Sequence, residues 1–475
     1  MCDREQEGWG GMALRVAVVG GGFSGVAFAI HLVRLASTPV AVQIIEQRAT
    51  PGLGLAYDSA DPAYRLNNPA APISTLYLDE PEHLHNWLEQ SGALAADPEM
   101  ATPRGRFPRR ATFGTYVAEQ LRQHAERPHA EVHHIRARAR SLARDAGGWS
   151  VTQEDGGVVK ADAVVLATGH PPAAIPGPLA AALAGDARLV PDPWGPGALD
   201  GIGPRDDVLI IGTGLTMADI VASLNSTGHR GRIVAVSRRG LRPLGSPMKP
   251  PAPWAGFGGD LPRTALSLLK RVRGAARAAM AAGEPWQSIS SVVHSSGQEV
   301  WAGLPLVEQR RFLRHLGSFY LAHRFRMGPQ VQQTVEDALT SGGLEVIAGH
   351  VRAVQADGAG ISVTLAPARG PVGLTLQRRV DRVVIATGPA PGTTIAANPL
   401  LAAACEAALL RQDALGLGID VDRNSQVLNV AGRPQPGLYV VGPPARGIFG
   451  DLVGVPDIVR QAQSVAAHLL AGDLR

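Results

Sequence analysis

Short apolar runs that end at a glycine recur along this sequence. One run occupies residues 15–19 and another residues 208–211, and a glycine-rich turn follows each. Each opens a block that closes with a further apolar run, at residues 163–166 and 383–385, and the triplet Ala-Thr-Gly. Runs of this length, rich in Val and Ile, predict buried strands of a parallel sheet. The chain therefore uses one structural plan twice.

A stretch of alternating apolar and polar residues, divided by glycine turns, precedes each closing triplet. These stretches cover residues 134–165 and 344–385 and predict two β-meanders. A strand, a glycine turn and a helix, closed by a meander and a returning strand, are typical of one dinucleotide-binding domain. Two copies predict an α/β fold with two Rossmann-like domains, and therefore two dinucleotides.

The pattern changes to helical spacing between residues 240 and 331. Apolar positions predict helices over residues 263–281 and 307–326, and we expect this region to decorate the second domain. Its connections contain prolines at positions 243, 247, 250, 251 and 253. Near the end of the chain, residues 438–441 predict a strand and residues 456–470 an amphipathic helix, which we expect to complete the first domain.

The first glycine turn has the spacing of a dinucleotide-binding fingerprint. Gly20, Gly22 and Gly25 follow a predicted strand and open an apolar helix at residues 26–35. Gly20 permits the tight turn, Gly22 lets a pyrophosphate approach the main chain, and Gly25 lets the helix pack closely on the strand. The positive end of the helix then holds the phosphates. The turn is completed by Phe23 and Ser24.

An acidic residue ends the second strand of this block. Residues 40–45 predict the strand, and Glu46 and Gln47 follow it. A carboxylate about 20 residues after the last glycine can accept hydrogen bonds from the ribose hydroxyls of adenosine. The first site therefore fits FAD or NAD and disfavours NADP.

The second glycine turn keeps part of the fingerprint. Gly212 and Gly214 are present and Leu215 and Thr216 follow them, but Met217 stands where the first copy has its third glycine. We expect this turn to bind the second dinucleotide. A degenerate turn, in a protein that binds nucleotides without turnover, is the alternative that Met217 leaves open.

Basic residues replace the acid after the second strand of this copy. Residues 233–236 predict the strand, and Ser237, Arg238 and Arg239 follow it. Guanidinium groups at this place suit the 2′-phosphate of NADPH, through bidentate, charge-assisted hydrogen bonds. NADPH is therefore favoured over NADH, and arginines that only solvate a strand end are the alternative.

Small, polar and proline residues fill the segment between residues 58 and 74. Amides and hydroxyls here can hydrogen-bond the pyrimidine edge of an isoalloxazine without titrating. We therefore take Arg65, Asn67 and Asn68 as catalytic candidates and Ser74 as a cofactor-binding candidate. A plain surface loop with capping residues is the alternative.

The sequence resembles the FAD/NAD(P)-binding family that lies near the class B flavin monooxygenases. The matching pieces are residues 20–25, 52–57, 66–69, 108–110, 167–170 and 212–216, with Gly114, Tyr116, Arg446, Gly447, Pro456, Ile458, Arg460 and Gln461. The resemblance implies an FAD domain that is split by an inserted NAD(P) domain. It also adds Thr168 and Gly169 to the cofactor-binding candidates.

The resemblance and the repeated plan together give the domain boundaries. The FAD-binding domain comprises residues 14–205 and 386–475, and the NAD(P)-binding domain residues 206–385 with its helical decoration at 240–331.

The chain departs from many two-dinucleotide flavoproteins after its last strand. Those proteins carry an aspartate there that binds the ribityl chain of FAD, whereas this chain has Gly442 followed by two prolines. Asp451 and the main-chain amides near Gly442 are the alternative ligands.

The resemblance implies flavin-dependent oxygenation. Family members of this pattern include urate hydroxylases and amino-acid N-hydroxylases. We expect an FAD-dependent, NADPH-driven monooxygenase that uses O₂ to hydroxylate a small polar nitrogen-containing substrate, with a urate-like purine favoured and an amino acid or amine next. The alternatives are a reductase or dehydrogenase without oxygenation and a non-catalytic dinucleotide-binding module.

Composition excludes several other classes. The net charge of +4 is spread as arginines, with only three lysines and no dense basic run, so no nucleic-acid partner is expected. The sequence has no His-Glu-x-x-His pattern, Cys/His cluster or Gly-x-Ser-x-Gly elbow, so no metal is expected. No apolar signal or membrane span stands out, which predicts a cytoplasmic protein. The start at Met1 or Met12 and the oligomeric state stay open.

Overall fold

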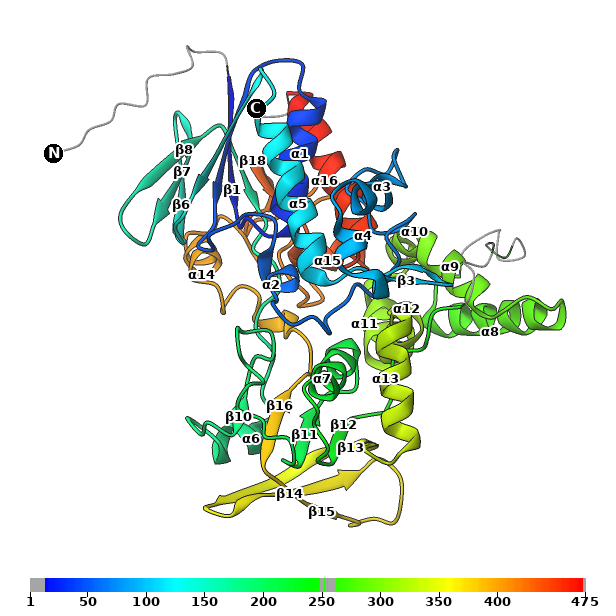
Figure 1. Ribbon diagram of the computed structural model, residues 1–475. Helices are drawn as coiled ribbons and strands as arrows, with labels where there is room; N and C mark the ends of the chain where they lie inside the picture. Colours follow the sequence, from blue (N-terminus) through cyan, green and yellow to red (C-terminus); the bar gives the residue numbers. More distant parts are fainter. Residues whose placement is uncertain (1–12, 248–251, 253, 255–261, 473–475) are drawn as a thin grey trace.

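The computed structural model describes residues 13–247, 252, 254 and 262–472. Two sheets of mainly parallel strands form the centres of two domains, and the chain passes from the first to the second and back (Figure 1). The first domain is drawn in blue and cyan with the orange and red C-terminal segment, and the second in green and yellow. The predicted α/β fold, with one domain inserted in the other, is confirmed.

The first sheet has six strands and takes its members from both ends of the chain. In spatial order they are β17 (Gln426–Leu428), β18 (Pro434–Val440), β9 (Ala163–Leu166), β1 (Leu14–Val19), β2 (Val40–Ile45) and β5 (Ala130–Ile135). All but β17 run parallel. Apolar runs form these strands because elements cover both faces of the sheet. Because β18 pairs with β9, the C-terminal segment contributes a strand to the first sheet.

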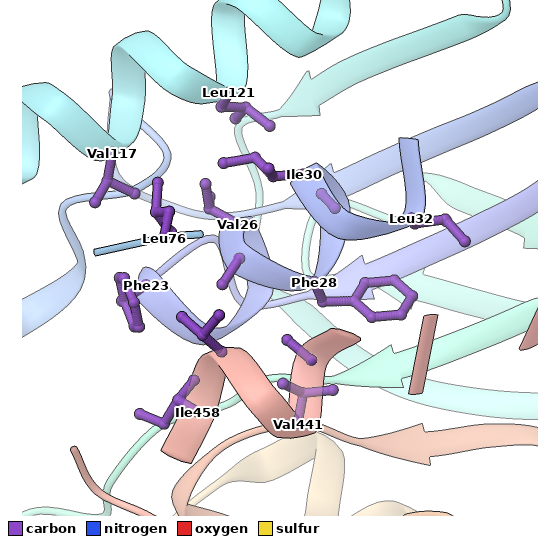
Figure 2. Packing of buried hydrophobic residues seen from close by; sticks show 14 of the residues in the cluster. Phe23, Val26, Phe28, Ile30, Leu32, Leu76, Val117, Leu121, Val441 and Ile458 are labelled. Atoms are coloured by element: carbon purple, nitrogen blue, oxygen red, sulfur yellow. The ribbon is translucent and has the colours of Figure 1, made fainter. Parts of the chain in front are cut away.

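Helix α1 (Phe23–Leu35) packs between this sheet and two further helices, α5 (Arg110–Ala125) and α16 (Val455–Leu470) (Figure 2). Its Val26, Phe28 and Ile30 have no exposed surface. A helix that is apolar on all sides is stable only when it is covered all round. Each fully buried side chain of this size contributes about 1.5–3 kcal/mol, so the sandwich holds the glycine turn before α1 firmly in place.

Seven strands form the second sheet. In spatial order they are β10 (Leu189–Val190), β16 (Arg382–Ile385), β11 (Val208–Ile211), β12 (Ile233–Ser237), β13 (Leu344–Asp357), β14 (Gly360–Pro367) and β15 (Leu376–Val380). Helices α7 (Leu215–Ser226) and α13 (Pro329–Thr340) pack together over this domain. Because β10 pairs with β16, the second domain includes residues ahead of the expected boundary at residue 206.

The two meanders differ in how they join their sheets. In the first domain, β6 (Ala139–Asp145), β7 (Gly148–Gln153) and β8 (Val158–Ala161) form a separate antiparallel sheet. In the second, β13 is parallel to β12 over its first part and antiparallel to β14 beyond it, so the meander continues the main sheet. Both meanders were predicted, but the separation of one of them depends on tertiary packing.

The helical region contains more and shorter helices than the sequence predicted. It contains α8 (Ala265–Ala281), α9 (Gln287–Ser295), α10 (Gly297–Gly303), α11 (Leu306–Arg311) and α12 (Gly317–Arg324). The single helix expected over residues 307–326 is interrupted by a π-turn at Phe312–Leu316, where the N–H of Gly317 donates to the carbonyl of Phe312. Glycine has a high entropic cost within a helix, which favours a break at this point. Among the described helices, none is long and apolar enough to span a membrane.

This region also bridges the two domains, whereas we expected it to decorate the second one only. Trp301 Nε1 donates to the carbonyl of Gly447 at 2.9 Å, and Arg310 donates to the carbonyl of Ala414 at 2.9 Å. Both acceptors belong to the returning segment of the first domain. The connections of the helical region contain several prolines, and those at 250, 251 and 253 lie outside the described residues.

Candidate active site between the two nucleotide-binding domains

The first glycine turn joins β1 to α1 and has no room for a side chain at two of its glycines. Gly20 has a φ of 101°, and a Cβ added there would lie 2.4 Å from the carbonyl oxygen of Ala167. A Cβ on Gly25 would lie 2.0 Å from the carbonyl oxygen of Gly20. Gly22 is the N-cap of α1, and no side chain caps the helix. The N–H groups of its first turn can therefore bind phosphate oxygens.

Glu46 lies beside this turn at the end of β2. Its buried carboxylate accepts hydrogen bonds from the backbone N–H groups of Gly21 and Arg48, both at 2.9 Å. Each carboxylate oxygen can accept a second hydrogen bond, so both retain capacity for a ribose hydroxyl. Gln47 is exposed, and only its place next to Glu46 supports a role in cofactor binding, which stays a prediction.

The returning segment reaches the same turn through Gly442. This glycine has a φ of 92°, and a Cβ added there would lie 2.4 Å from the Oγ of Ser24. Its N–H donates to the Oε1 of Gln461 at 2.7 Å, so that amide already has a partner. Thr168 presents a buried Oγ1 without a hydrogen-bond partner among the described residues, and Gly169 beside it has a φ of 72° with open space around the Cβ position.

The motif at residues 52–57 explains another part of the resemblance. The N–H of Gly52 donates to the carbonyl of Gly21 at 2.7 Å, which fixes this loop against the glycine turn. Phe23 packs against Tyr57 and Phe113 with ring centroids 5.9 and 5.7 Å apart. The buried position of Phe23 shows that it supports the turn by packing.

The segment at residues 58–74 is not a plain surface loop. Arg65 is buried and donates to both carboxylate oxygens of Asp97, at 2.8 and 3.0 Å. This ion pair favours a structural role for Arg65 over the catalytic one that we expected, because its guanidinium is already used. Asn67 and Asn68 are half-buried, Ser74 is buried, and their roles toward a flavin stay predictions.

The second glycine turn repeats the main constraint of the first. A Cβ on Gly212 would lie 2.0 Å from the carbonyl oxygen of Ala386, the counterpart of Ala167 in the second block. Gly214 is the N-cap residue of α7, and no side chain caps this helix, which begins with Leu215 and Thr216. The space around the Cβ position of Gly214 is open. Met217 is fully buried, so it fills the core where the first copy requires a glycine.

The two arginines after β12 have different surroundings. Arg239 donates to the carbonyls of His315 and Arg314 at 2.7 and 3.2 Å, and therefore holds the helical region. Arg238 is exposed, and no hydrogen bond or ion pair within the described residues occupies its side chain. The structure thus separates a binding candidate, Arg238, from a structural residue, Arg239. The hydroxyl of Ser237 already has one hydrogen-bond partner, because its Oγ lies 2.7 Å from Thr213 Oγ1.

A cavity of about 1160 Å³ opens between the second glycine turn, the helical region and the first domain. Residues 212–216 and Arg242 line it from the second domain, and His170, Arg446 and Asp451 line it from the first. Arg242 was not predicted as a site residue, and no role was expected for His170 or Arg446, although both belong to the matching pieces of the resemblance. A cavity at the carboxyl ends of parallel strands is the usual ligand site of such folds.

Asp451 belongs to a charged cluster on the wall of this cavity. Its Oδ2 accepts from Tyr320 Oη at 3.0 Å and from Arg324 Nε at 2.9 Å. Burial opposes ionisation of Asp451, but His294 and Arg324 outweigh it and hold its pKa at about 2. Arg324 also contacts Asp457 at 3.3 Å. His294, Asp451 and Asp457 lie close enough for metal ligands, but the guanidinium of Arg324 already supplies the positive charge.

His170 follows the Ala-Thr-Gly triplet of the first block and projects into the same cavity. The surrounding protein, with the charge of Arg446, lowers its pKa to about 4. The imidazole is therefore neutral near pH 7 and can accept a hydrogen bond.

Comparisons with known proteins find similarity to proteins that bind FAD and NAD(P). Residues 17–171 match the model of a family described as FAD-NAD(P)-binding. The match covers the first glycine turn and the closing triplet of the first block, so the likeness to that family rests on this part of the chain. A curated relative is the L-aspartate N-monooxygenase (nitrosuccinate-forming) of Streptomyces cremeus, which is 33% identical over 276 residues, or 50% of this chain and 41% of the relative. The chain thus matches less than half the length of that relative.

Solved structures extend the likeness of the fold over the whole chain. The reduced form of ornithine hydroxylase from Pseudomonas aeruginosa aligns with a TM-score of 0.64 at 17% identity, over 98% of this chain and all of that one. The FAD-bound cadaverine monooxygenase from Erwinia amylovora aligns with a TM-score of 0.64 at 14% identity, over 97% and 95%.

The residues of the first domain fit FAD. The uncapped start of α1 offers N–H groups to a pyrophosphate, Glu46 offers its carboxylate to a ribose, and the buried Thr168 Oγ1 needs a partner. The steric demands at Gly20 and Gly25 are those of a turn that brings backbone against a dinucleotide.

Proposed function

We propose that this protein is an FAD- and NADPH-dependent N-monooxygenase of an amino acid or amine. The observation that carries the proposal is the shared cavity, because the second glycine turn and His170 and Arg446 of the first domain open onto the same space. A nicotinamide held at the second turn and a flavin held by the first domain would meet there, beside room for a small substrate.

The expected preference for a urate-like purine is corrected by the comparisons. The relatives described above act on aspartate, ornithine and cadaverine, each of which carries an aliphatic amine. These relatives support an amine nitrogen as the reacting atom and give no support to a purine.

When bound, FAD supplies the chemistry of accepting hydride from NADPH and activating O₂. The chain would position the reactants: the start of α1 would hold the pyrophosphate of FAD, and the start of α7 would hold that of NADPH. Arg238 would bind the 2′-phosphate of NADPH. The amine must lose its proton before its lone pair can react, and neutral His170 on the wall of the cavity can accept a hydrogen bond from it.

The test is NADPH oxidation by the purified flavoprotein, followed with an oxygen electrode and a peroxide assay. L-Aspartate, L-ornithine, L-lysine, cadaverine and urate are added in turn, and hydroxylated products are identified by mass spectrometry. One amine should raise the oxidation rate, lower the peroxide yield and become hydroxylated. NADPH oxidation without any oxygenated product would establish a reductase instead, and absence of bound flavin would leave a nucleotide-binding module.

A further inference from the structure

Arg446 is a cation without a hydrogen-bonded partner on the wall of the cavity. It is the first residue of α15 (Arg446–Phe449), directly after the segment that touches the first glycine turn. Within the described part of the chain, no hydrogen bond or ion pair engages its guanidinium, and its Nε is buried and unpaired. A half-buried cation in this state is unfavourable, so the site is suited to an anion.

Two carboxylates, Asp413 and Asp451, attract Arg446 electrostatically, but both accept hydrogen bonds from other groups. Asp413 accepts from the backbone N–H groups of Leu415 and Leu417, at 2.8 and 2.9 Å, and also from Gly418. Asp451 accepts from Tyr320 and Arg324. Both carboxylates attract Arg446 through space without forming an ion pair with it. The guanidinium therefore keeps its donors for a ligand in the cavity.

The phosphates of the two dinucleotides have their own binding groups. The uncapped helix starts at Gly22 and Gly214 serve the pyrophosphates, and Arg238 is placed after β12 for a 2′-phosphate. His170, next to Arg446, is neutral and does not compete for an anion. A carboxylate is the anion that an amino-acid substrate would bring into this space, and its planar oxygens match the donors of a guanidinium.

We propose that Arg446 binds the carboxylate of the substrate, so that the enzyme selects an amino acid over the amine that lacks this group. The inference rests on the proposed function and narrows it, because it separates amino acids such as ornithine and lysine from diamines such as cadaverine. It also assigns the orientation of the substrate, with the carboxylate at α15 and the amine free to face the flavin.

The test compares equilibrium binding within matched pairs by isothermal titration calorimetry of the FAD-loaded protein. The pairs are L-lysine with cadaverine and L-ornithine with putrescine, in each of which the second member lacks the carboxylate of the first. The wild type should bind the carboxylate-bearing member of its substrate pair at least about tenfold more tightly. Arg446→Met should abolish this difference without changing the affinity for the decarboxylated member, and Arg446→Lys should restore part of it. Arg310→Met, which removes an exposed arginine from the same interface, should leave it unchanged.

The outcomes separate the possible anions. Loss of FAD or a weaker affinity for NADP⁺ in Arg446→Met, with the discrimination intact, would assign the arginine to a cofactor and overturn the inference. Equal binding within every pair, or no binding of any carboxylate, would overturn it as well. Hydroxylation of an amine with no preference for the carboxylate would leave the proposed function standing, whereas no oxygenation of any amine would reject that function.

Discussion

Arg110 of α5 and Asp219 of α7 form an ion pair between the two domains, with the Nη2 of the arginine 2.6 Å from the Oδ2 of the aspartate. The side chains are 14% and 6% exposed, so the pair is largely removed from water. The guanidinium also lies 4.6 Å from the centre of the Trp194 ring. One arginine therefore links a helix that packs against α1, which follows the first glycine turn, to the helix that starts at the second glycine turn.

Removal of one partner of this pair should destabilise the protein strongly. Arg110→Met leaves a buried carboxylate without its cation, which costs about 3–5 kcal/mol. Chemical denaturation should show this loss, and the double variant Arg110→Met/Asp219→Leu should regain much of it because neither charge remains. Equal stability of the single variant and the wild type would contradict the ion pair.

The same pair should give the stability a measurable pH dependence. Burial raises the pKa of Asp219 to about 6, although Arg110 opposes the shift. The folded protein then binds a proton that the unfolded chain has released, so this group stabilises the fold near pH 4 and loses that contribution as the pH rises to about 6. Thermal unfolding midpoints across this range should fall less steeply in Asp219→Asn. Parallel profiles would show that Asp219 does not titrate there.

The glycine turns give a set of matched substitutions. Gly20→Ala places a Cβ 2.4 Å from the carbonyl oxygen of Ala167 and should lower stability by more than about 2 kcal/mol. Gly169→Ala also has a positive φ but meets no atom within 4 Å, and should cost only about 1 kcal/mol. Thermal unfolding and the flavin content of the purified proteins measure both effects. Similar losses in the two variants would show that the contact with Ala167 is unimportant.

Selectivity for NADPH should depend on Arg238 and not on Arg239. Arg238→Met should weaken NADPH about tenfold and leave NADH unchanged, because only the 2′-phosphate is affected. Arg239→Met should instead loosen the helical region, since this arginine donates to the carbonyls of Arg314 and His315. Fluorescence titrations with both nucleotides measure the first effect and hydrogen exchange the second. Loss of NADPH selectivity only in Arg239→Met would reverse the assignment.

The cluster around Asp451 should hold the helical region on the first domain. Arg324→Met removes the cation that Asp451 and Asp457 share and leaves both carboxylates partly buried. Faster hydrogen exchange in α9 and α12 is expected, because these helices carry His294 and Arg324. The control, Arg310→Met, breaks one exposed hydrogen bond and should have little effect. Unchanged exchange in Arg324→Met would show that other contacts hold the region.

Local sequence patterns were sufficient to predict several strands and the tight turns of this protein. The apolar runs at β1, β9 and β11 were predicted at or within one residue of their ends, because a buried parallel strand requires a short continuous apolar segment. The positions of the tight glycine turns were predicted, because Gly20 and Gly212 obey steric limits that act within a strand-turn-helix unit and against the triplet that returns beside it. Local geometry of this kind can be predicted because it restricts which residue types occur and how they are spaced.

The tertiary structure alone decided which charged side chains remain available. Arg65 and Arg446 are the same residue type, but Arg65 is paired with Asp97, whereas Arg446 lies beside carboxylates that other groups occupy. Arg238 and Arg239 are adjacent, yet only Arg239 meets the carbonyls of the π-turn region. These partners come from segments far apart in the chain, and a guanidinium's partner depends on distance and burial, which spacing along the sequence does not encode.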